Sequence, residues 1–268
     1  MTAERGAELD ELRRDFAAFG CEEGRAPRVS LELCSRPCPP QETAASWRGR
    51  GFAVRSFPGG RTIRYDDGCW ARYDYRERAG VVHAEDSARL RELAYLAVLS
   101  RAGEELDRRG LHRVHALGVA APAGAALVLL PSGGGKSTLA LELLRRRSLA
   151  VLSDECPIVA ADGVVRPFPL RLALRAGADL SGLPGGSLRT FRRRGYEEKS
   201  LLDAAALGAS PAAAAPLRWL LLGSPSSGAP RLEPLGRVGA LAARARALGI
   251  GVGQPQMAEY KARADHAR

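Results

Sequence analysis

The sequence predicts an α/β protein, and three observations support this prediction. An apolar run at 125–130 is typical of a buried strand, and a helical pattern over 136–147 follows it after a glycine-rich loop. Short apolar segments at 113–119 and 150–153 flank this unit, as expected where strands alternate with a helix. Hydrophobic residues make up 46% of the chain and charged residues 26%, which excludes a disordered protein.

The N-terminal part predicts a small antiparallel sheet between two helices. Strands are expected at 29–33, 52–57, 62–65 and 71–76, with turns at Gly59-Gly60 and Asp67-Gly68. A short helix is expected within 1–20, and a longer one over 87–109 has apolar residues at helical spacing and ends at Gly110. We therefore predict a small β-rich domain over 1–86 and a second domain over 87–268, in which the helix 87–110 is the connection.

The second domain carries the remaining expected elements. These are a hairpin over 158–168 that turns at Asp162-Gly163, a last strand at 219–222 and a last helix at 236–247. The segment 176–200 is glycine-rich and basic, and we expect it to be a mobile loop. The Ala/Pro-rich segment 204–216 is expected to be a linker.

The basic excess of the chain is confined to its second part. The sequence has 40 Lys+Arg and 30 Asp+Glu, a net charge of +10. Residues 1–110 carry 19 basic and 19 acidic side chains, so 111–268 carry the whole excess. We expect the second part to bind anions and the neutral first part to recognise a substrate or partner. Nucleic acid is not expected as a partner, because aromatic residues are few and none is interleaved with the basic runs.

Composition also predicts a cytoplasmic protein that does not enter a membrane. The first residues are charged and lack the apolar core of a secretory signal. The longest uncharged stretch, 116–135, contains two prolines and five glycines, unlike a membrane span. The five cysteines form an odd, sparse set, as in reducing compartments. Cys34 and Cys38 have no second Cys or His pair nearby, so no structural metal site is expected.

The segment between the strand 125–130 and the following helix is typical of a phosphate-binding loop. Backbone N–H groups of such a loop, with the N-terminus of the next helix, hold phosphate oxygens. Lys136 would reach the β- and γ-phosphates, and the Ser137 hydroxyl would ligate Mg²⁺. The residues expected to bind the nucleotide are Ser132, Gly133, Gly134, Gly135, Lys136, Ser137 and Thr138. Leu130 stands where the full motif has its first Gly, so a glycine-rich helix entry without phosphate binding is the alternative.

Two adjacent carboxylates follow the next strand. Asp154 and Glu155 end the segment 150–153, directly after the phosphate-loop helix. A carboxylate there can face the γ-phosphate, where it either holds Mg²⁺ or takes a proton from an attacking hydroxyl. Two acids could divide these roles. The alternative is a polar strand end without a function.

The segment from about 111 to 175 resembles the HPr kinase/phosphorylase-like kinases. The matching positions are Lys136-Ser137 for the phosphate loop, Asp154-Glu155 for the family's Asp-Asp pair and His115 for its active-site His. The stretch 162–175 resembles the strand continuation in HPr-kinase-related proteins of peptide-modification gene clusters, including lasso-peptide kinases. The small N-terminal sheet with its helix also resembles that subgroup.

The resemblance implies a catalytic domain with a mixed sheet, similar to ATP-dependent phosphoenolpyruvate carboxykinase. It implies a kinase that uses ATP and Mg²⁺ to phosphorylate a hydroxyl, most simply Ser of a peptide or protein. Asp154 would be the base, Glu155 would lie near Mg²⁺, and His115 would lie in the active site. Other peptide-modification proteins and further copies of the chain, often in rings, are the implied partners. The Ile-Arg-Gly-Leu-Gly stretch of true HPr kinase/phosphorylases is absent, so HPr as substrate and reverse phosphorolysis are not expected.

Several arginines complete the set of candidates. Arg171 and Arg175 follow the hairpin, and we expect at least one of them, with Arg175 as the catalytic candidate, to stabilise charge on a transferring phosphoryl group. Basic residues of 176–200, such as Arg189 and Lys199, would close over the nucleotide, bind an acidic substrate or remain solvated. The run 145–147 is expected to solvate a helix end.

Two other functions stay open at this stage. One is a nucleotide-binding accessory protein of a peptide-modification system, without phosphotransfer, which the missing loop glycine favours. The other is a kinase for an amino acid or metabolite, closer to the carboxykinases.

Overall fold

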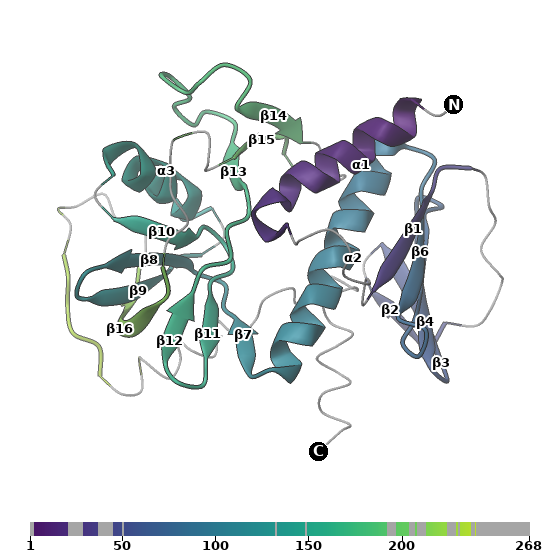
Figure 1. Ribbon diagram of the computed structural model, residues 1–268, viewed down its shortest axis with the longest axis horizontal. Helices are drawn as coiled ribbons and strands as arrows, with labels where there is room; N and C mark the ends of the chain where they lie inside the picture. The colour runs from purple at the N-terminus through teal and green to yellow at the C-terminus, as the bar shows by residue number, and fades with distance from the viewer. Residues whose placement is uncertain are drawn as a thin grey trace. The chain divides into compact units, whose positions relative to one another are not determined.

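The computed structural model describes residues 3–20, 29–36, 45–49, 51–131, 133–147, 149–191, 197–203, 207, 213–223, 229, 231–236 and 239. These residues form two compact units, the first up to Glu104 and the second from Glu105 onward. Each unit contains a mixed β-sheet and few helices, so the α/β class is confirmed (Figure 1).

The sheet of the first unit has six strands in the order β1-β6-β5-β4-β3-β2. Their bounds are Ser30–Cys34 (β1), Trp47–Gly49 (β2), Phe52–Phe57 (β3), Gly60–Tyr65 (β4), Trp70–Asp74 (β5) and Ala79–His83 (β6). Strands β2 to β6 form an antiparallel meander. The β3–β4 hairpin turns through Pro58 and Gly59, and Gly59 adopts a φ of +84° that favours glycine.

The expectation of a purely antiparallel N-terminal sheet was wrong for one strand. β1 pairs with β6 in parallel, with Ser30 opposite Ala79. β1 and β2 lie at opposite edges of the sheet, so β1 is not joined to its partner β6 by a hairpin, and a parallel pairing is possible. Sequence analysis also missed β2, which has only three residues, and β6, whose AGVVH segment lacks a polar/apolar alternation.

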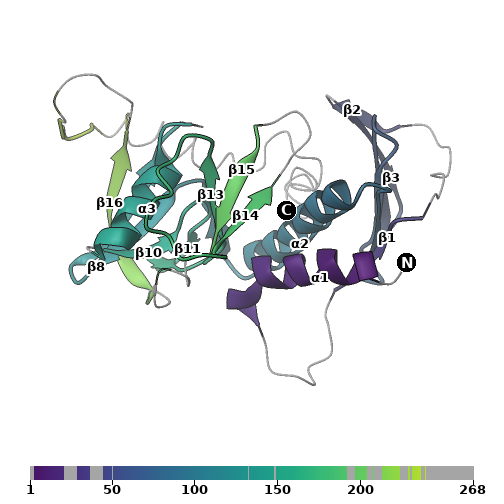
Figure 2. The ribbon, with the colours of Figure 1, turned by 90° about the horizontal axis from the view of Figure 1, so that it is seen from above.

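Helix α2 (Ser87–Arg108) packs on one face of this sheet (Figures 1 and 2). The Asp86 carboxylate caps it by accepting a 2.7 Å hydrogen bond from the Arg89 amide. Leu90 and Leu93 fill the interface with the sheet. The buried residues of this core are Cys69, Ala71, Val82, Ala84, Leu90 and Leu93. The part of the predicted connecting helix up to Glu104 therefore belongs to the first unit.

Helix α1 (Ala3–Asp15) packs against α2 on the same side of the sheet, and a 3₁₀ turn (Ala17–Phe19) follows it (Figure 2). Arg91 of α2 holds α1 through ion pairs with Glu11 at 3.0 Å and Asp15 at 3.2 Å. The opposite face of the sheet carries no described helix (Figures 1 and 2).

The main sheet of the second unit has seven strands in the order β10-β8-β9-β16-β12-β11-β7. Their bounds are Leu111–Arg113 (β7), Leu117–Ala121 (β8), Gly124–Leu129 (β9), Ala150–Ser153 (β10), Ile158–Ala160 (β11), Val164–Arg166 (β12) and Ala215–Leu222 (β16). β9 and β16 pair in parallel, with Leu129 opposite Leu222. The other pairs of this sheet are antiparallel.

Helix α3 (Lys136–Arg146) packs against this sheet and against a three-stranded antiparallel sheet of order β13-β15-β14 (Figure 1). The smaller sheet contains Leu172–Arg175 (β13), Leu188–Phe191 (β14) and Lys199–Leu202 (β15). Its core with α3 and the main sheet consists of Leu117, Val119, Ala126, Ala140, Leu141, Leu144, Leu172, Leu174 and Leu202. This layering brings the start of α3 close to the ends of β10 and β13.

Two expectations for the second unit were wrong. The single strand over 113–119 is two strands, because the chain leaves β7 at Val114, whose amide donates to the Pro157 carbonyl, and enters a new pairing as β8. Val114 and Ala116 lie in the break between the two strands and are buried, so the apolar pattern is continuous and the sequence does not reveal the break. The expected mobile loop over 176–200 contains β14 and the start of β15.

Other expectations fall partly or wholly outside the described residues. The last strand begins at Ala215 rather than Trp219, so it includes the end of the expected linker. Most of the segment 204–212 and nearly all of the expected helix 236–247 lie outside the described residues. Where the structure does describe the chain, no helix combines the length and apolar character that a membrane crossing requires.

Candidate active site

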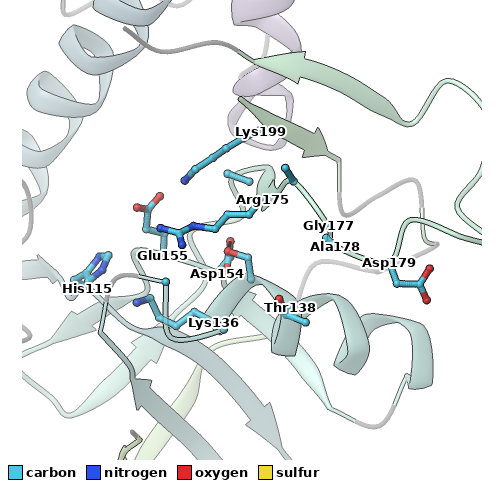
Figure 3. A pocket seen from close by; sticks show the side chains of 15 residues that line it. His115, Lys136, Thr138, Asp154, Glu155, Arg175, Gly177, Ala178, Asp179 and Lys199 are labelled. Carbon is cyan, nitrogen blue, oxygen red and sulfur yellow. Dashed lines mark hydrogen bonds between the residues drawn. The ribbon is translucent and has the colours of Figure 1, made fainter. Parts of the chain in front are cut away.

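A cavity of about 330 Å³ lies at the start of α3 in the second unit (Figure 3). Its wall combines the phosphate loop, the first turn of α3, the residues after β10, and parts of β13 and β15. The lining side chains with acid, base or hydroxyl groups are His115, Lys136, Ser137, Thr138, Asp154, Glu155, Arg175, Asp179 and Lys199. The fold thus brings the catalytic and metal-binding candidates of the sequence together, and it adds Lys199 from β15.

The loop before α3 turns tightly because two of its glycines have left-handed backbones. Gly133 has a φ of +78° and Gly135 a φ of +92°. Gly134 donates its N–H to the Pro131 carbonyl at 2.9 Å. Gly135 is the N-cap of α3 and has no side chain to cap this end, so the first backbone N–H groups of the helix are suited to an anion. Ser132, also predicted in this loop, lies outside the described residues.

The Lys136 side chain folds back along the loop. Its Nζ donates hydrogen bonds to the carbonyl oxygens of Leu130 at 2.7 Å and Pro131 at 3.4 Å. Burial lowers the pKa of this ammonium, and the carboxylates of Glu155 and Asp154 oppose the shift. Because an ammonium has three N–H donors, one remains for a ligand in the cavity.

Leu130 replaces the first glycine of the motif, and the fold provides space for its side chain. The parallel pairing of β9 with β16 brings Gly223 beside it, and the Gly223 amide donates to the Leu129 carbonyl at 2.9 Å. A Cβ added at Gly223 would lie 2.3 Å from Leu130 Cδ2. The glycine directly after β16 therefore leaves room for the leucine that stands in place of the loop glycine.

Asp154 follows β10 and lies against the first turn of α3. The Ser137 hydroxyl donates a 2.8 Å hydrogen bond to its Oδ2, while its Oδ1 is buried and meets no donor at normal hydrogen-bond geometry within the described residues. Burial raises the pKa of Asp154 to about 6, and the hydrogen bond from Ser137 opposes the shift. Glu155 raises this pKa further, whereas Lys136 and the Ala173 amide lower it. A carboxylate with a near-neutral pKa suits a general base.

Glu155 and His115 also line the cavity (Figure 3). Glu155 is exposed, in contrast to the adjacent Asp154. His115 lies in the break between β7 and β8, not in a strand as expected. Burial and then the nearby Lys136 lower the pKa of His115, and Glu155 opposes them. These effects favour the neutral imidazole, which can accept or donate a hydrogen bond.

Two cations enter the cavity from the three-stranded sheet. Arg175 on β13 lies directly opposite Lys199 on β15, so both side chains lie on one face of that sheet. A Cβ added at Gly133 would lie 2.8 Å from Arg175 Nη1, which places the guanidinium against the phosphate loop. Neither cation forms an ion pair in the described part of the chain. Like charges opposite one another destabilise a sheet, so this pair favours an anion between them.

The remaining arginine candidates contribute to structure instead. Arg145 of α3 donates to the carbonyl oxygens of Asp179 at 2.8 Å and Ser181 at 2.9 Å, which attaches the segment after β13 to the helix. Arg171 stacks over the Phe191 ring, with 5.2 Å between the guanidinium carbon and the ring centroid. Arg171 does not line the cavity, so Arg175 is the member of that pair that reaches the site.

Arg189 in the expected mobile loop is also part of the folded sheet. It lies on β14 and forms a 2.7 Å ion pair with Asp203. Its side chain therefore does not face the cavity, unlike that of Lys199.

The donor set fits a nucleoside triphosphate with Mg²⁺. The left-handed glycines, the uncapped helix end and three cations suit phosphate oxygens. The Ser137 hydroxyl and the Asp154 and Glu155 carboxylates are the oxygen ligands that Mg²⁺ prefers. No group of three His, Cys, Asp or Glu side chains in the described residues could hold a metal by itself. Phosphate oxygens and water would therefore complete the coordination, as is usual for Mg²⁺.

Comparison with known proteins adds no family assignment. No model of a known protein family matches the chain, and no curated protein sequence matches it.

The first prediction concerns the buried carboxylate. The pKa of Asp154 is about 6 in the folded protein, whereas the ordinary pKa of an aspartate is 3.8. Ionisation of Asp154 as the pH rises from about 4 to 6 therefore lowers the free energy of unfolding by about 3 kcal/mol. Asp154→Asn removes this charge and keeps the acceptor for Ser137. We expect the variant to exceed the wild type in free energy of unfolding at pH 7.5 by up to about 3 kcal/mol, and the difference to disappear near pH 4. Urea unfolding at both pH values measures this, and a difference independent of pH would contradict it.

The second prediction concerns the space beside the loop. Gly223→Val inserts a side chain against Leu130 and should lower the free energy of unfolding by about 1–3 kcal/mol. The double variant Leu130→Ala/Gly223→Val should recover part of this loss, because the two positions share one volume. Gly185→Val is the matched control, since a Cβ there meets nothing within 4 Å. Strictly additive effects in urea unfolding would show that the two residues do not compete for space.

Proposed function

We propose that this chain is an ATP- and Mg²⁺-dependent kinase that transfers the γ-phosphate to a hydroxyl, most simply Ser of a peptide or protein. The observation that carries the proposal is the position of Asp154. This carboxylate is buried in the phosphate-loop cavity, its pKa is raised to about 6, and Ser137 of the loop helix orients it at 2.8 Å. General-base catalysis needs such a group near the γ-phosphate.

The proposal extends to a P-loop catalytic domain similar to phosphoenolpyruvate carboxykinase and to membership of the HPr kinase/phosphorylase-like kinases. Support comes from the strand–loop–α3 unit and from the acidic pair after the next strand. Both strands, β9 and β10, belong to one mixed sheet. The position of His115 on the same cavity also supports it.

The chemical step follows from the roles of these side chains. The acceptor hydroxyl gives its proton to Asp154 as its oxygen attacks the γ-phosphorus, and the bond from that phosphorus to the bridging β,γ-oxygen breaks. Ser137 orients the base, and Lys136 with the loop amides holds the triphosphate. Mg²⁺ supplies charge neutralisation at the phosphates when bound, with Ser137 and Glu155 as its protein ligands.

Arg175 and Lys199 face the region where charge develops on the transferring group. Their positive charges lie on one face of the β13–β15 pair, and Arg175 also lies against Gly133 of the loop. Fixed cations at that position stabilise a phosphoryl transition state without further reorganisation.

The third prediction separates binding from phosphotransfer. Lys136→Ala should lose phosphotransfer and weaken nucleotide binding, because it removes the cation on the phosphates. Asp154→Asn should lower the transfer rate by about 10²–10⁴-fold and still bind nucleotide, because it removes only the base. The rate of phosphotransfer is measured with γ-labelled ATP and either Ser-containing peptides or free amino acids as acceptors. Nucleotide affinity is measured by titration with a fluorescent ATP analogue.

The control for that experiment is Asp162→Asn. Asp162 is an exposed carboxylate in the β11–β12 turn, so this substitution should change neither the phosphotransfer rate nor the nucleotide affinity. Full transfer by Asp154→Asn would contradict the base assignment. Nucleotide binding by the wild type without any labelled product would contradict the kinase and support an accessory protein.

The fourth prediction tests the cation pair. Arg175→Ala and Lys199→Ala should each lower kcat by about 10–10³-fold, because each removes a charge that acts on the transition state. Lys199→Arg should keep most of the activity. Arg166→Ala, an exposed arginine on β12, is the control of equal charge change. An unchanged kcat in both alanine variants would show that the pair has no catalytic role.

A further inference from the structure

A second concave region lies in the first unit, on the face of the six-stranded sheet opposite α2. The cavity there has a volume of about 380 Å³. Its lining comes from β2, β3, β4 and the turn after β4, and includes Arg48, Arg55, Arg64, Thr62 and Asp66. None of these residues has a role in the proposed phosphotransfer.

The register of the strands explains how the arginines reach one face. Arg48 aligns with Ala53 on β3, and Ala53 aligns with Arg64 on β4, so these three residues form one row across the sheet. Arg55 aligns with Thr62 and Thr62 with Arg72 on β5, which forms a second row two residues away. Both rows alternate with the buried Val54 and Ile63, whose side chains point to the α2 side.

We call the surface formed by Arg48, Arg55, Arg64 and Arg72 the arginine face. Three of these side chains are exposed and Arg55 is half-buried. None of the four forms an ion pair with another residue that the structure describes. Three described carboxylates share this face: Asp66 on the cavity wall, Asp74 two residues after Arg72 on β5, and Glu32 on the far edge strand β1. With four arginines and three carboxylates among its described residues, the arginine face has an excess of positive charge, although residues 1–104 carry equal numbers of basic and acidic side chains.

We infer that the arginine face is a docking surface for an acidic polypeptide segment in extended conformation. Guanidinium groups bind carboxylates through paired, charge-assisted hydrogen bonds. Same-face side chains of an extended chain repeat at about 7 Å, which equals the separation of the two arginine rows along the strands. Among the described strands, β2, which carries Arg48, lies at the edge of the sheet, where backbone groups can also pair with an added strand.

Charge and ring contacts favour a polypeptide over a nucleic acid. Polynucleotide binding relies on an extended positive field, whereas residues 1–104 carry equal numbers of basic and acidic side chains, so the arginine face is a local excess. The aromatic rings on this face are also engaged within the unit. Arg72 covers the Phe57 ring at 5.0 Å, and Trp70 stacks on His83 at 5.5 Å, so one side of each ring is occupied before any base could stack there.

The inference does not depend on phosphotransfer, because the arginine face can be tested without nucleotide. The test uses the full chain and a fluorescein-labelled ten-residue peptide of alternating Glu and Thr, with fluorescence anisotropy as the readout. The comparison probes are the same peptide with Gln in place of Glu and an oligo-deoxythymidine of ten nucleotides. We expect binding of the Glu peptide that weakens with added NaCl, and weaker binding of the other two probes.

Variants assign this binding to the surface. Arg55→Ala/Arg64→Ala should raise the Kd of the Glu peptide by about tenfold or more. Arg13→Ala/Arg14→Ala removes the same charge from exposed positions on α1, which packs on the other side of the sheet, and should leave the Kd within about twofold. Lys199→Ala, in the other basic cavity, should also leave it unchanged. Circular dichroism and thermal unfolding confirm that the variants fold.

Four outcomes would overturn the inference. In the first, the Glu peptide does not bind. In the second, its affinity falls equally in both double variants, which would indicate a general charge effect. It could lose affinity only in Lys199→Ala, which would place it in the phosphate-loop cavity. Tighter binding of the oligonucleotide, lost in Arg55→Ala/Arg64→Ala, would replace the acidic polypeptide with a single-stranded nucleic acid.

Discussion

The hydrogen bond between Ser137 and Asp154 joins the two elements on which the candidate active site depends. Ser137 is in the first turn of α3, and Asp154 is the first residue after β10, so this contact holds the helix that follows the phosphate loop against the end of the neighbouring strand. It also keeps one carboxylate oxygen occupied, while the other, among the residues that the structure describes, meets no donor at normal hydrogen-bond geometry. An acid that is buried and only partly satisfied has a raised pKa, which weakens the fold at neutral pH and prepares the group to take a proton.

The environments of the two adjacent acids differ in the same way as their proposed roles. Asp154 is buried and close to the loop, whereas Glu155 is exposed on the cavity wall. Two carboxylates in unequal surroundings can act one as a base and the other as a metal ligand, because burial favours the neutral form and exposure the charged form. Lys136 and His115, both less basic than usual, lie close to this pair and share its electrostatic environment.

The two units use positive charge differently. In the second unit, cations from three elements converge on one cavity: Lys136 from α3, Arg175 from β13 and Lys199 from β15. In the first unit, four strands each contribute one arginine to a single sheet face. A compact triphosphate and an extended acidic chain would each match one of these distributions.

The sequence alone determined the local elements whose signals are short-range. The glycine loop, α3 and the acidic pair were recognisable because their residue types and spacing reflect local backbone and phosphate chemistry. Periodicity likewise located α2 and the β3–β4 hairpin. Lys199 was named only as one of several basic loop residues, because no local pattern links it to Arg175.

Tertiary structure decided the features that depend on residues distant in sequence. Only the β13–β15 register places Lys199 opposite Arg175, only the β9–β16 pairing gives Leu130 its space beside Gly223, and only the meander aligns the four arginines. Strand order and register also decided that the N-terminal sheet is mixed and that the segment 113–119 is two strands. These outcomes arise from hydrogen bonding and packing between segments that are many residues apart, and such interactions leave no periodic signal in either segment.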